Sequence, residues 1–190
     1  MEKFSNKEER VLTAAEDVFA RYGFARTTMG DIAKAAAISR PALYLIFPDK
    51  EAIFTRVIEM MDARSLDLIQ NEVDQIAAID QKLLHACTIW GLHGVELATA
   101  YPDAADLFDF QFPAVRQVYE RFQQFLVRIL EKGTASWELP VSRADFATTL
   151  TYGLRGLRYA ATDVNHMRHL IEVHVTVYGL TLTRTDASIG

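Results

Sequence analysis

Three side chains between residues 40 and 45 have the chemistry needed to contact DNA. Arg40, Tyr44 and Leu45 supply a guanidinium, a phenol and an aliphatic group, and they fall on one face of a short predicted helix. Arginine can bridge the O6 and N7 atoms of guanine, and an aliphatic side chain can lie against the methyl group of thymine. Alternatively, Arg40 would contact a phosphate and Leu45 would only cover the core.

Two short helices joined by a tight turn position these side chains within residues 27–50. Thr28 can cap the first helix, and Asp31 completes a capping box three residues later. Ser39 caps the second helix, where Pro41 is tolerated because no N–H bond is due in the first turn. The positions expected to face inward are Ile32, Ala33, Ala36, Leu43 and Phe47. This is the layout of a helix-turn-helix, whose second helix enters the major groove of DNA.

A longer pattern surrounds this helix pair. It consists of Thr28, Ile32-Ala33, Ala36, Ile38-Ser39, Leu43-Tyr44, Phe47-Pro48 and Lys50, followed by Glu51-Ala52-Ile53-Phe54. The segment resembles the DNA-binding domain of the tetracycline-repressor (TetR) family of bacterial transcription regulators. A bare helix pair is common, but the run LYxxFPxKEAI at a fixed distance after the turn is specific. The resemblance covers about a quarter of the chain, and the rest is similar in length and all-helical pattern.

The resemblance implies how this segment would hold DNA. Tyr44 and Lys50 would contact phosphates, and the alternative for Tyr44 is a buried tyrosine. Thr28 would join them through its hydroxyl and the N-terminus of its helix, where N–H groups without an intrahelical partner favour an anion. With Arg40, Pro41 and Leu45, these residues form the expected DNA-binding surface.

Three positions depart from the family pattern. Ala37 stands where a glycine is usual in the turn, and a positive φ there would cost about 1 kcal/mol. Leu45 and Ile46 stand where the family usually has tyrosine, arginine or histidine. The second helix is therefore poor in hydrogen-bond donors, which bears on the strength of binding more than on the fold.

Positive charge is concentrated around the helix pair, although the 190-residue chain carries a net charge of −5. Between Val18 and Lys50 there are five cationic residues and two carboxylates, which gives 5 − 2 = +3. A local positive surface on an acidic protein is sufficient to neutralise phosphates.

Apolar residues recur at helical spacing along the rest of the chain, which predicts an all-α protein. We expect Gly23 to end the first helix. Further helices are expected at about 49–76, 80–101, 114–132, 142–161 and 165–183, with a short one after Pro102. The helix from Asp49 is long enough to bridge two bodies. We place the domain boundary inside it, with a DNA-binding domain at 1–56 and an effector-binding and dimerisation domain at 57–190.

Aromatic and polar side chains in the middle of the chain form a candidate effector site. The TetR family binds small effectors among such helices, and the resemblance implies a lining of Trp90, His93, Phe108, Phe112, Arg116 and Tyr119. His93, Arg116 or Tyr119 would orient the polar end of a mostly apolar ligand. The ligand would be anionic if Arg116 faces inward. Alternatively, these aromatic residues are plain core.

Small residues at a spacing of three to four, Gly153, Gly156 and Ala160, would let another helix approach closely. In the TetR family the last two helices of each protomer form a four-helix dimer interface. The resemblance therefore implies an interface containing Tyr152, Gly153, Gly156, Leu157, Ala160, Val173 and Val177. The alternative is packing within one chain.

Catalytic motifs do not stand out: the sequence has no glycine-rich phosphate loop, no GxSxG and no HExxH. We expect no enzyme activity, no cofactor and no metal. Cys87 is the sole cysteine, which fits a reducing cytoplasm, and no signal peptide or membrane span is expected.

These features together predict a homodimeric, ligand-responsive transcriptional repressor that reads a palindromic operator. Two alternatives remain open. One is a ligand-independent DNA-binding protein with a structural or partner-recruiting role, and the other is a helical binding module that does not read DNA.

Overall fold

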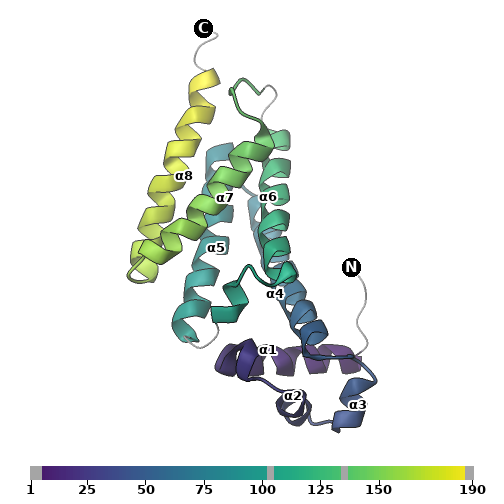
Figure 1. Cartoon of the computed structure of the whole chain (residues 1–190). Coiled ribbons are helices and arrows are strands. Elements are labelled where there is room, and N and C mark those ends of the chain that lie inside the picture. Colours follow the sequence, from purple (N-terminus) through teal and green to yellow (C-terminus); the bar gives the residue numbers. More distant parts are fainter. Residues whose placement is uncertain (1–5, 102–104, 134–136, 187–190) are drawn as a thin grey trace. The chain divides into compact units, whose positions relative to one another are not determined.

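The computed structural model describes residues 6–101, 105–133 and 137–186, and these residues form an all-α fold, as predicted (Figure 1). The helices are α1 (Asn6–Arg26), α2 (Met29–Ala35), α3 (Arg40–Tyr44), α4 (Lys50–Val73), α5 (Ile79–Ala100), the short 3-10 helix η1 (Ala105–Phe108), α6 (Pro113–Gly133), α7 (Arg143–Ala160) and α8 (Val164–Asp186). Among the described helices, none has the length and apolar character needed to cross a membrane.

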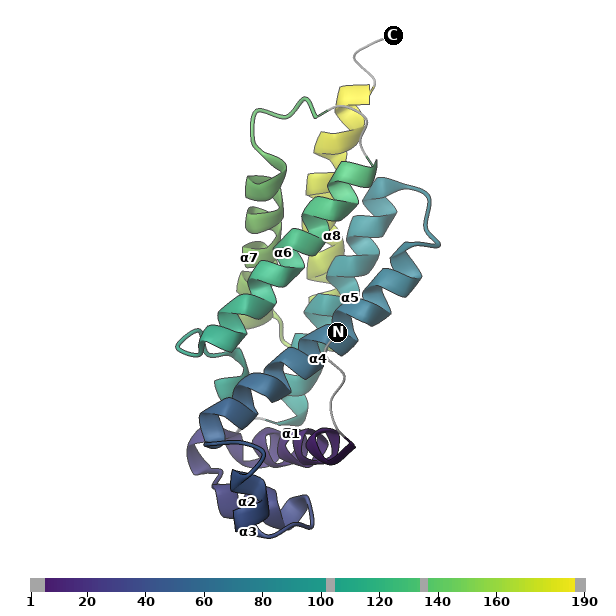
Figure 2. The same cartoon turned by 90° about the vertical axis from the view of Figure 1, so that its right-hand side faces the viewer.

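The chain divides into two compact units. The first consists of Met1–Ala63 and Leu97–Val118, and the second of Arg64–Glu96 and Tyr119–Gly190. Helix α4 is continuous across the division, which falls inside it (Figure 2). The sequence-based boundary at residue 56 differs from this division, because it assigned residues 97–118 to the second domain. In the structure η1 packs against α1, so this segment belongs with the first unit.

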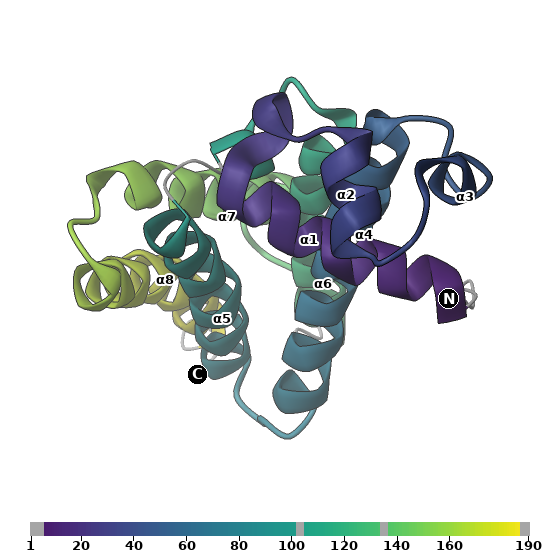
Figure 3. The same ribbon diagram turned by 90° about the horizontal axis from the view of Figure 1, so that it is seen from below.

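A cluster of four phenylalanines holds the first unit together. Phe24 and Phe54 lie 4.9 Å apart between ring centroids, and Phe19 lies 5.2 Å from Phe54. Phe112 completes the cluster, 4.8 Å from Phe24 and 4.7 Å from Phe54. The cluster joins α1 and α4 to the segment before α6. Helix α2 packs against both α1 and α3 (Figure 3).

Gly23 interrupts the helical backbone of α1, where the sequence predicted a helix end. Its φ of 72° and ψ of 165° lie in a region that is almost closed to residues with a Cβ. The hydroxyl of the buried Thr27 donates to the Gly23 carbonyl at 2.7 Å, so a carbonyl freed by the interruption is satisfied. One further turn, to Arg26, then leads into α2.

The turn between α2 and α3 contains a left-handed alanine. Ala37 has a φ of 54°, which confirms that this turn needs the conformation for which glycine is the usual residue. The Ala37 N–H donates to Lys34 O at 3.2 Å, and the Ile38 N–H donates to Ala33 O at 3.0 Å. These two bonds form a Schellman motif, with Ala37 in the position that glycine normally occupies.

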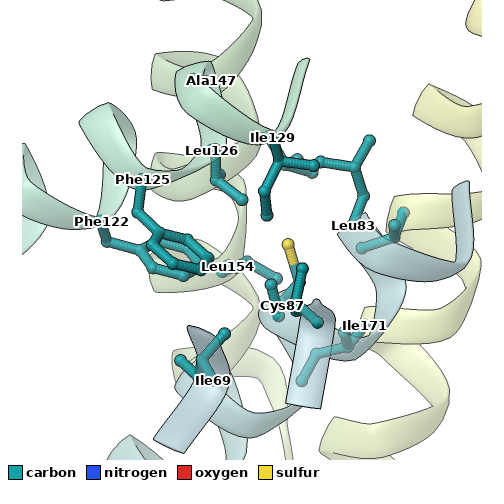
Figure 4. Close-up of a cluster of buried hydrophobic side chains, with 14 of the residues drawn as sticks. Ile69, Leu83, Cys87, Phe122, Phe125, Leu126, Ile129, Ala147, Leu154 and Ile171 are labelled. Atoms are coloured by element: carbon teal, nitrogen blue, oxygen red, sulfur yellow. The ribbon is translucent and has the colours of Figure 1, made fainter. Parts of the chain in front are cut away.

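Five helices contribute to the core of the second unit. Figure 4 shows Cys87 of α5 surrounded by apolar side chains from α4, α5, α6, α7 and α8; they include Ile69, Leu83, Leu126, Ile129, Leu154 and Ile171. Burial raises the pKa of the Cys87 thiol, so the sulfur stays protonated and unreactive. Gly91 lets α8 approach, because a Cβ there would lie 2.8 Å from Ile171 Cδ1.

Replacing Ala37 by glycine should raise the free energy of unfolding by about 1 kcal/mol, because it removes the steric cost of a Cβ at positive φ. Urea unfolding followed by circular dichroism measures the change. Ala63→Gly is the matched control, since Ala63 is also exposed but lies inside α4. That control should lower the free energy of unfolding by about 0.5–1 kcal/mol. A loss of stability in both variants would contradict the strain assigned to Ala37.

Candidate nucleic-acid interface

The N-terminus of α2 is closed by the predicted capping box. The Asp31 N–H donates to Thr28 Oγ1 at 3.2 Å, and the Thr28 N–H donates to Asp31 Oδ2 at 2.9 Å. The Thr28 hydroxyl also donates to Asp31 Oδ2, at 2.6 Å. These bonds from Thr28, with smaller contributions from Lys34 and Arg40, lower the pKa of Asp31. The hydroxyl expected to meet a phosphate is therefore engaged within the protein, beside a carboxylate.

Helix α3 has a buried inner face and an exposed outer face, as the sequence predicted. Ser39 caps the helix by accepting a hydrogen bond from the Ala42 N–H at 3.3 Å. Leu43 and Phe47 are buried in the first unit. On the opposite side, four exposed residues form what we call the outer face of α3: Arg40, Pro41, Tyr44 and Leu45.

Two alternatives left open by the sequence are thereby settled. Tyr44 is 49% exposed, so it is not a buried tyrosine. Leu45 is 88% exposed, so it does not cover the core. The aliphatic part of Arg40 lies alongside Gly30 of α2, where a Cβ would be 3.8 Å from Arg40 Cδ and Nε. The outer face of α3 thus combines one cation, one phenol and two apolar groups, all accessible to a partner.

Lys50 has an internal role that the sequence reasoning missed. Its ammonium donates to the Phe24 carbonyl at 2.7 Å and lies 4.1 Å from the centroid of the Phe24 ring. The side chain is partly buried, and it connects the first residue of α4 to the end of α1. An ammonium has three donors, so one is already committed to the fold. Contact between Lys50 and a phosphate stays a prediction.

The candidate effector residues fall into different groups. In the second unit, the Trp90 ring stacks on Phe122 at 4.3 Å and 5°, and it meets Tyr119 edge-on at 5.1 Å. Tyr119 is buried, which raises the pKa of its phenol. His93, one turn from Trp90 on α5, is exposed.

The remaining three candidates belong to the first unit. Phe112 is part of the phenylalanine cluster, and Phe108 is half-buried in η1. Arg116 does not face inward: it is exposed, and its guanidinium donates to the carbonyls of Phe110 and Gln111. The structure therefore brings Trp90 and Tyr119 together but places Phe108, Phe112 and Arg116 with the helix-turn-helix. The sequence could not show that Arg116 turns back onto its own loop.

The small residues Gly153 and Gly156 of α7 face different surroundings. A Cβ on Gly156 would meet nothing within 4 Å, whereas a Cβ on Gly153 would lie 2.2 Å from His174 Nε2. Gly153 thus serves the packing of α8 against α7, and Leu157 packs on the core of the second unit. The predicted interface residues that are exposed on α7 and α8 are Tyr152, Gly156, Ala160, Val173 and Val177. Tyr159 and Leu180 were not in the predicted interface, and they are also exposed apolar residues of these helices.

Comparison with known proteins identifies the helix-turn-helix. The family model described as bacterial regulatory proteins, tetR family, matches residues 11–57, which contain α2, the turn and α3. The HTH-type transcriptional regulator EthR of Mycolicibacterium smegmatis is 32% identical over 79 residues, or 42% of this chain. The chain spans 36% of the length of that relative, and it likewise spans less than half of several other curated regulators.

Solved structures with the same fold extend over nearly the whole chain. A regulator from Saccharomonospora viridis in complex with choline has a TM-score of 0.72 at 19% identity, covering 91% of this chain and 97% of its own. FadR from Bacillus subtilis in complex with stearoyl-CoA has a TM-score of 0.69 at 15% identity, covering 88% and 97%. The motif match and the shared fold lead to one conclusion: the chain belongs to the TetR family of helix-turn-helix transcriptional regulators.

Proposed function

We propose that this protein is a homodimeric repressor that binds a palindromic operator and releases it when a small effector binds. The outer face of α3 is the observation that carries the proposal. Tyr44 and Leu45 are large exposed residues that contribute little to their own core, and Arg40 is exposed on the same face. In a helix-turn-helix, this is the surface that enters the major groove. A recognition helix with one cation would make few hydrogen bonds to the base edges. It would rely on apolar contact with thymine methyl groups.

Dimerisation is supported by the exposed apolar residues of α7 and α8. Val173, Val177 and Leu180 recur at a spacing of four and three along α8, and they are 50%, 59% and 56% exposed. Gly156 on α7 leaves open space into which another helix can fit. A twofold axis through this surface would pair two copies of α3, which matches a palindromic site.

An effector site is supported by the aromatic group of Trp90, Tyr119 and Phe122. These rings would suit a mostly apolar or aromatic ligand. The relatives solved with choline and with stearoyl-CoA support ligand binding by this fold, although each binds a different molecule. An effector can release DNA only if it binds the two states of the protein with different affinity, and the coupling is reciprocal.

Removing the Arg40 side chain tests directly whether Arg40 recognises a base in the operator. Arg40→Ala should lose selectivity at one base in each half-site, by roughly 1–3 kcal/mol per mismatch, while phosphate-based affinity persists. Fluorescence anisotropy with DNA from upstream of the protein's own gene, and with single-base variants, measures this. Arg10→Ala on the exposed surface of α1 removes the same charge away from α3 and serves as the control.

Two results would redirect the proposal. A uniform loss of affinity over all DNA variants would make Arg40 a phosphate contact. Absence of any salt-dependent binding by the unmodified protein would favour the helical binding module.

Gly156→Leu should disrupt the dimer but leave the protomer folded. Within one protomer the added side chain enters open space, whereas in the proposed dimer it would overpack the interface between the two copies. The expected loss in association free energy is roughly 1–3 kcal/mol. Analytical ultracentrifugation should show dissociation, and circular dichroism should show unchanged helix content. Gly153→Leu is the informative counterpart, since its Cβ collides with His174 and should lower the melting temperature instead. An unchanged dimer in Gly156→Leu would mean that this surface is not the interface.

Effector binding should change the fluorescence of Trp90, because its ring is stacked within the aromatic group. The other tryptophan, Trp137, donates to Val141 O at 2.6 Å near the start of α7. A Trp137→Phe variant should therefore keep the fluorescence change. The same compound should also release operator DNA. A compound that binds tightly without altering DNA affinity would not be the inducer, and failure of broad screening to move Trp90 emission would favour the ligand-independent alternative.

A further inference from the structure

The second unit contains a cavity of about 340 Å³ where α4 ends and α5 begins. The last turn of α4 and the turn after it form one side, through Gln70, Val73, Asp74 and Ala77. Helix α6 forms the other side with its last two turns. We call this the terminal cavity. It does not include the Trp90 and Tyr119 side chains, so it is distinct from the effector site proposed above.

The floor of the terminal cavity is apolar and belongs to the core. Val73, Phe125 and Ile129 are each less than 7% exposed, and all three belong to the core of the second unit. The end of α6 is held against α5, because a Cβ on Gly133 would lie 2.3 Å from Ile79 Cδ1. The floor therefore offers a preformed apolar surface, which reduces the ordering cost of binding a ligand.

The mouth of the terminal cavity is cationic. Lys82, Arg128 and Lys132 line it together with one carboxylate, Asp74, so the local charge is 3 − 1 = +2 in a chain of net charge −5. The Lys82 ammonium donates to Val73 O at 3.0 Å, which fixes it at the C-terminus of α4. Asp74 accepts a hydrogen bond from Gln70 Nε2 at 2.8 Å.

Arg128 and Lys132 are the cations available to a ligand. Both are exposed, and within the described part of the chain neither takes part in an ion pair. The Arg128 guanidinium lies 5.6 Å from the centroid of the Phe125 ring, which holds it over the apolar floor. A guanidinium in this position can donate two parallel hydrogen bonds to a carboxylate or a phosphate.

We propose that the terminal cavity binds a small organic anion, with an aromatic or branched apolar body against Phe125 and Ile129 and its acidic group between Arg128 and Lys132. The volume lies near the lower end of the roughly 300–1,000 Å³ typical of ligand pockets, so the ligand is compact. A cation is disfavoured by the three positive side chains. A neutral ligand would not form charge-assisted hydrogen bonds with Arg128 and Lys132.

The proposal goes beyond the repressor function and does not depend on it, because its test measures binding to the protein without DNA. Fluorine NMR of para-trifluoromethylbenzoate, mixed with the full-length protein, should show line broadening at millimolar concentration. The isosteric neutral amide, para-trifluoromethylbenzamide, should bind at least about tenfold more weakly, since it lacks the charge-assisted hydrogen bonds. The corresponding aryl phosphonate shows whether a phosphate-type group is preferred over a carboxylate.

Four variants locate the binding. Arg128→Gln should weaken binding of the benzoate by about tenfold, and Ala77→Trp should abolish it by filling the cavity. Asp74→Asn should strengthen it, because the repelling charge is removed while an oxygen acceptor remains for Gln70. Arg168→Gln is the matched control, since Arg168 is exposed on α8 and does not line the cavity. Its affinity for the benzoate should equal that of the unmodified protein.

The proposal is overturned if neither the benzoate nor the phosphonate binds at millimolar concentration. It is also overturned if the amide binds as well as the benzoate. Binding that survives both Arg128→Gln and Ala77→Trp would place the anion elsewhere on the protein. Each variant that binds more weakly should keep the circular dichroism spectrum and melting temperature of the parent, so that loss of fold is not mistaken for loss of the site.

Discussion

The contact between Lys50 and Phe24 closes the segment on which the DNA-binding surface depends. The ammonium binds both the carbonyl and the ring of Phe24, across 26 residues of sequence. Helices α2 and α3 lie entirely within the loop that this contact closes. Gly23 makes the contact possible, because its left-handed φ breaks α1 just before Phe24 and the chain then turns toward α2. The phenylalanine cluster packs around the same point, through Phe54 and Phe112.

Local hydrogen bonds then set the orientation of α3 within that loop. The capping box of Thr28 and Asp31 fixes the start of α2, and the Schellman motif at Ala37 fixes its end. Both use backbone groups that would otherwise lack a partner at the helix ends. The steric cost at Ala37 is thus offset by two hydrogen bonds and by the burial of Leu43 on the inner side of α3. With its inner side fixed, α3 presents Arg40, Tyr44 and Leu45 outward.

Sequence patterns predicted the features that depend on neighbouring residues. The caps of α2 and α3 and the inner and outer faces of α3 follow from spacings of three or four residues, and the structure confirms them. The positive φ at Ala37 followed from the position of the alanine in the family pattern.

Features that depend on distant residues did not follow from the sequence. The partner of Lys50 is a backbone carbonyl, which leaves no mark in the residue types. Gly153 and Gly156 have the same spacing and chemistry, yet one faces His174 and the other faces open space, because the position of α8 decides between them. The family resemblance grouped Arg116 and Phe112 with Trp90, whereas the structure places them in the first unit.

The aromatic rings of the second unit form one packed series that runs from the terminal cavity through the proposed effector residues to the proposed dimer surface. Phe125, at the floor of the terminal cavity, stacks with Phe122 at 6.4 Å, and Phe122 stacks with Trp90. Tyr119 contacts Trp90 and also stacks with the exposed Tyr152 of α7, at 6.0 Å.

Protein cores are close-packed, so a ligand that displaces the Phe125 ring must also displace the rings packed against it. Phe122 and Trp90 must then move as well, or the ligand must bind above the floor without entering it. Spatial continuity alone does not transmit a signal, because coupling requires two discrete arrangements of the rings. The stacked pair of Trp90 and Phe122 is the element whose second arrangement would be needed, since it lies between Phe125 and the pair of Tyr119 and Tyr152.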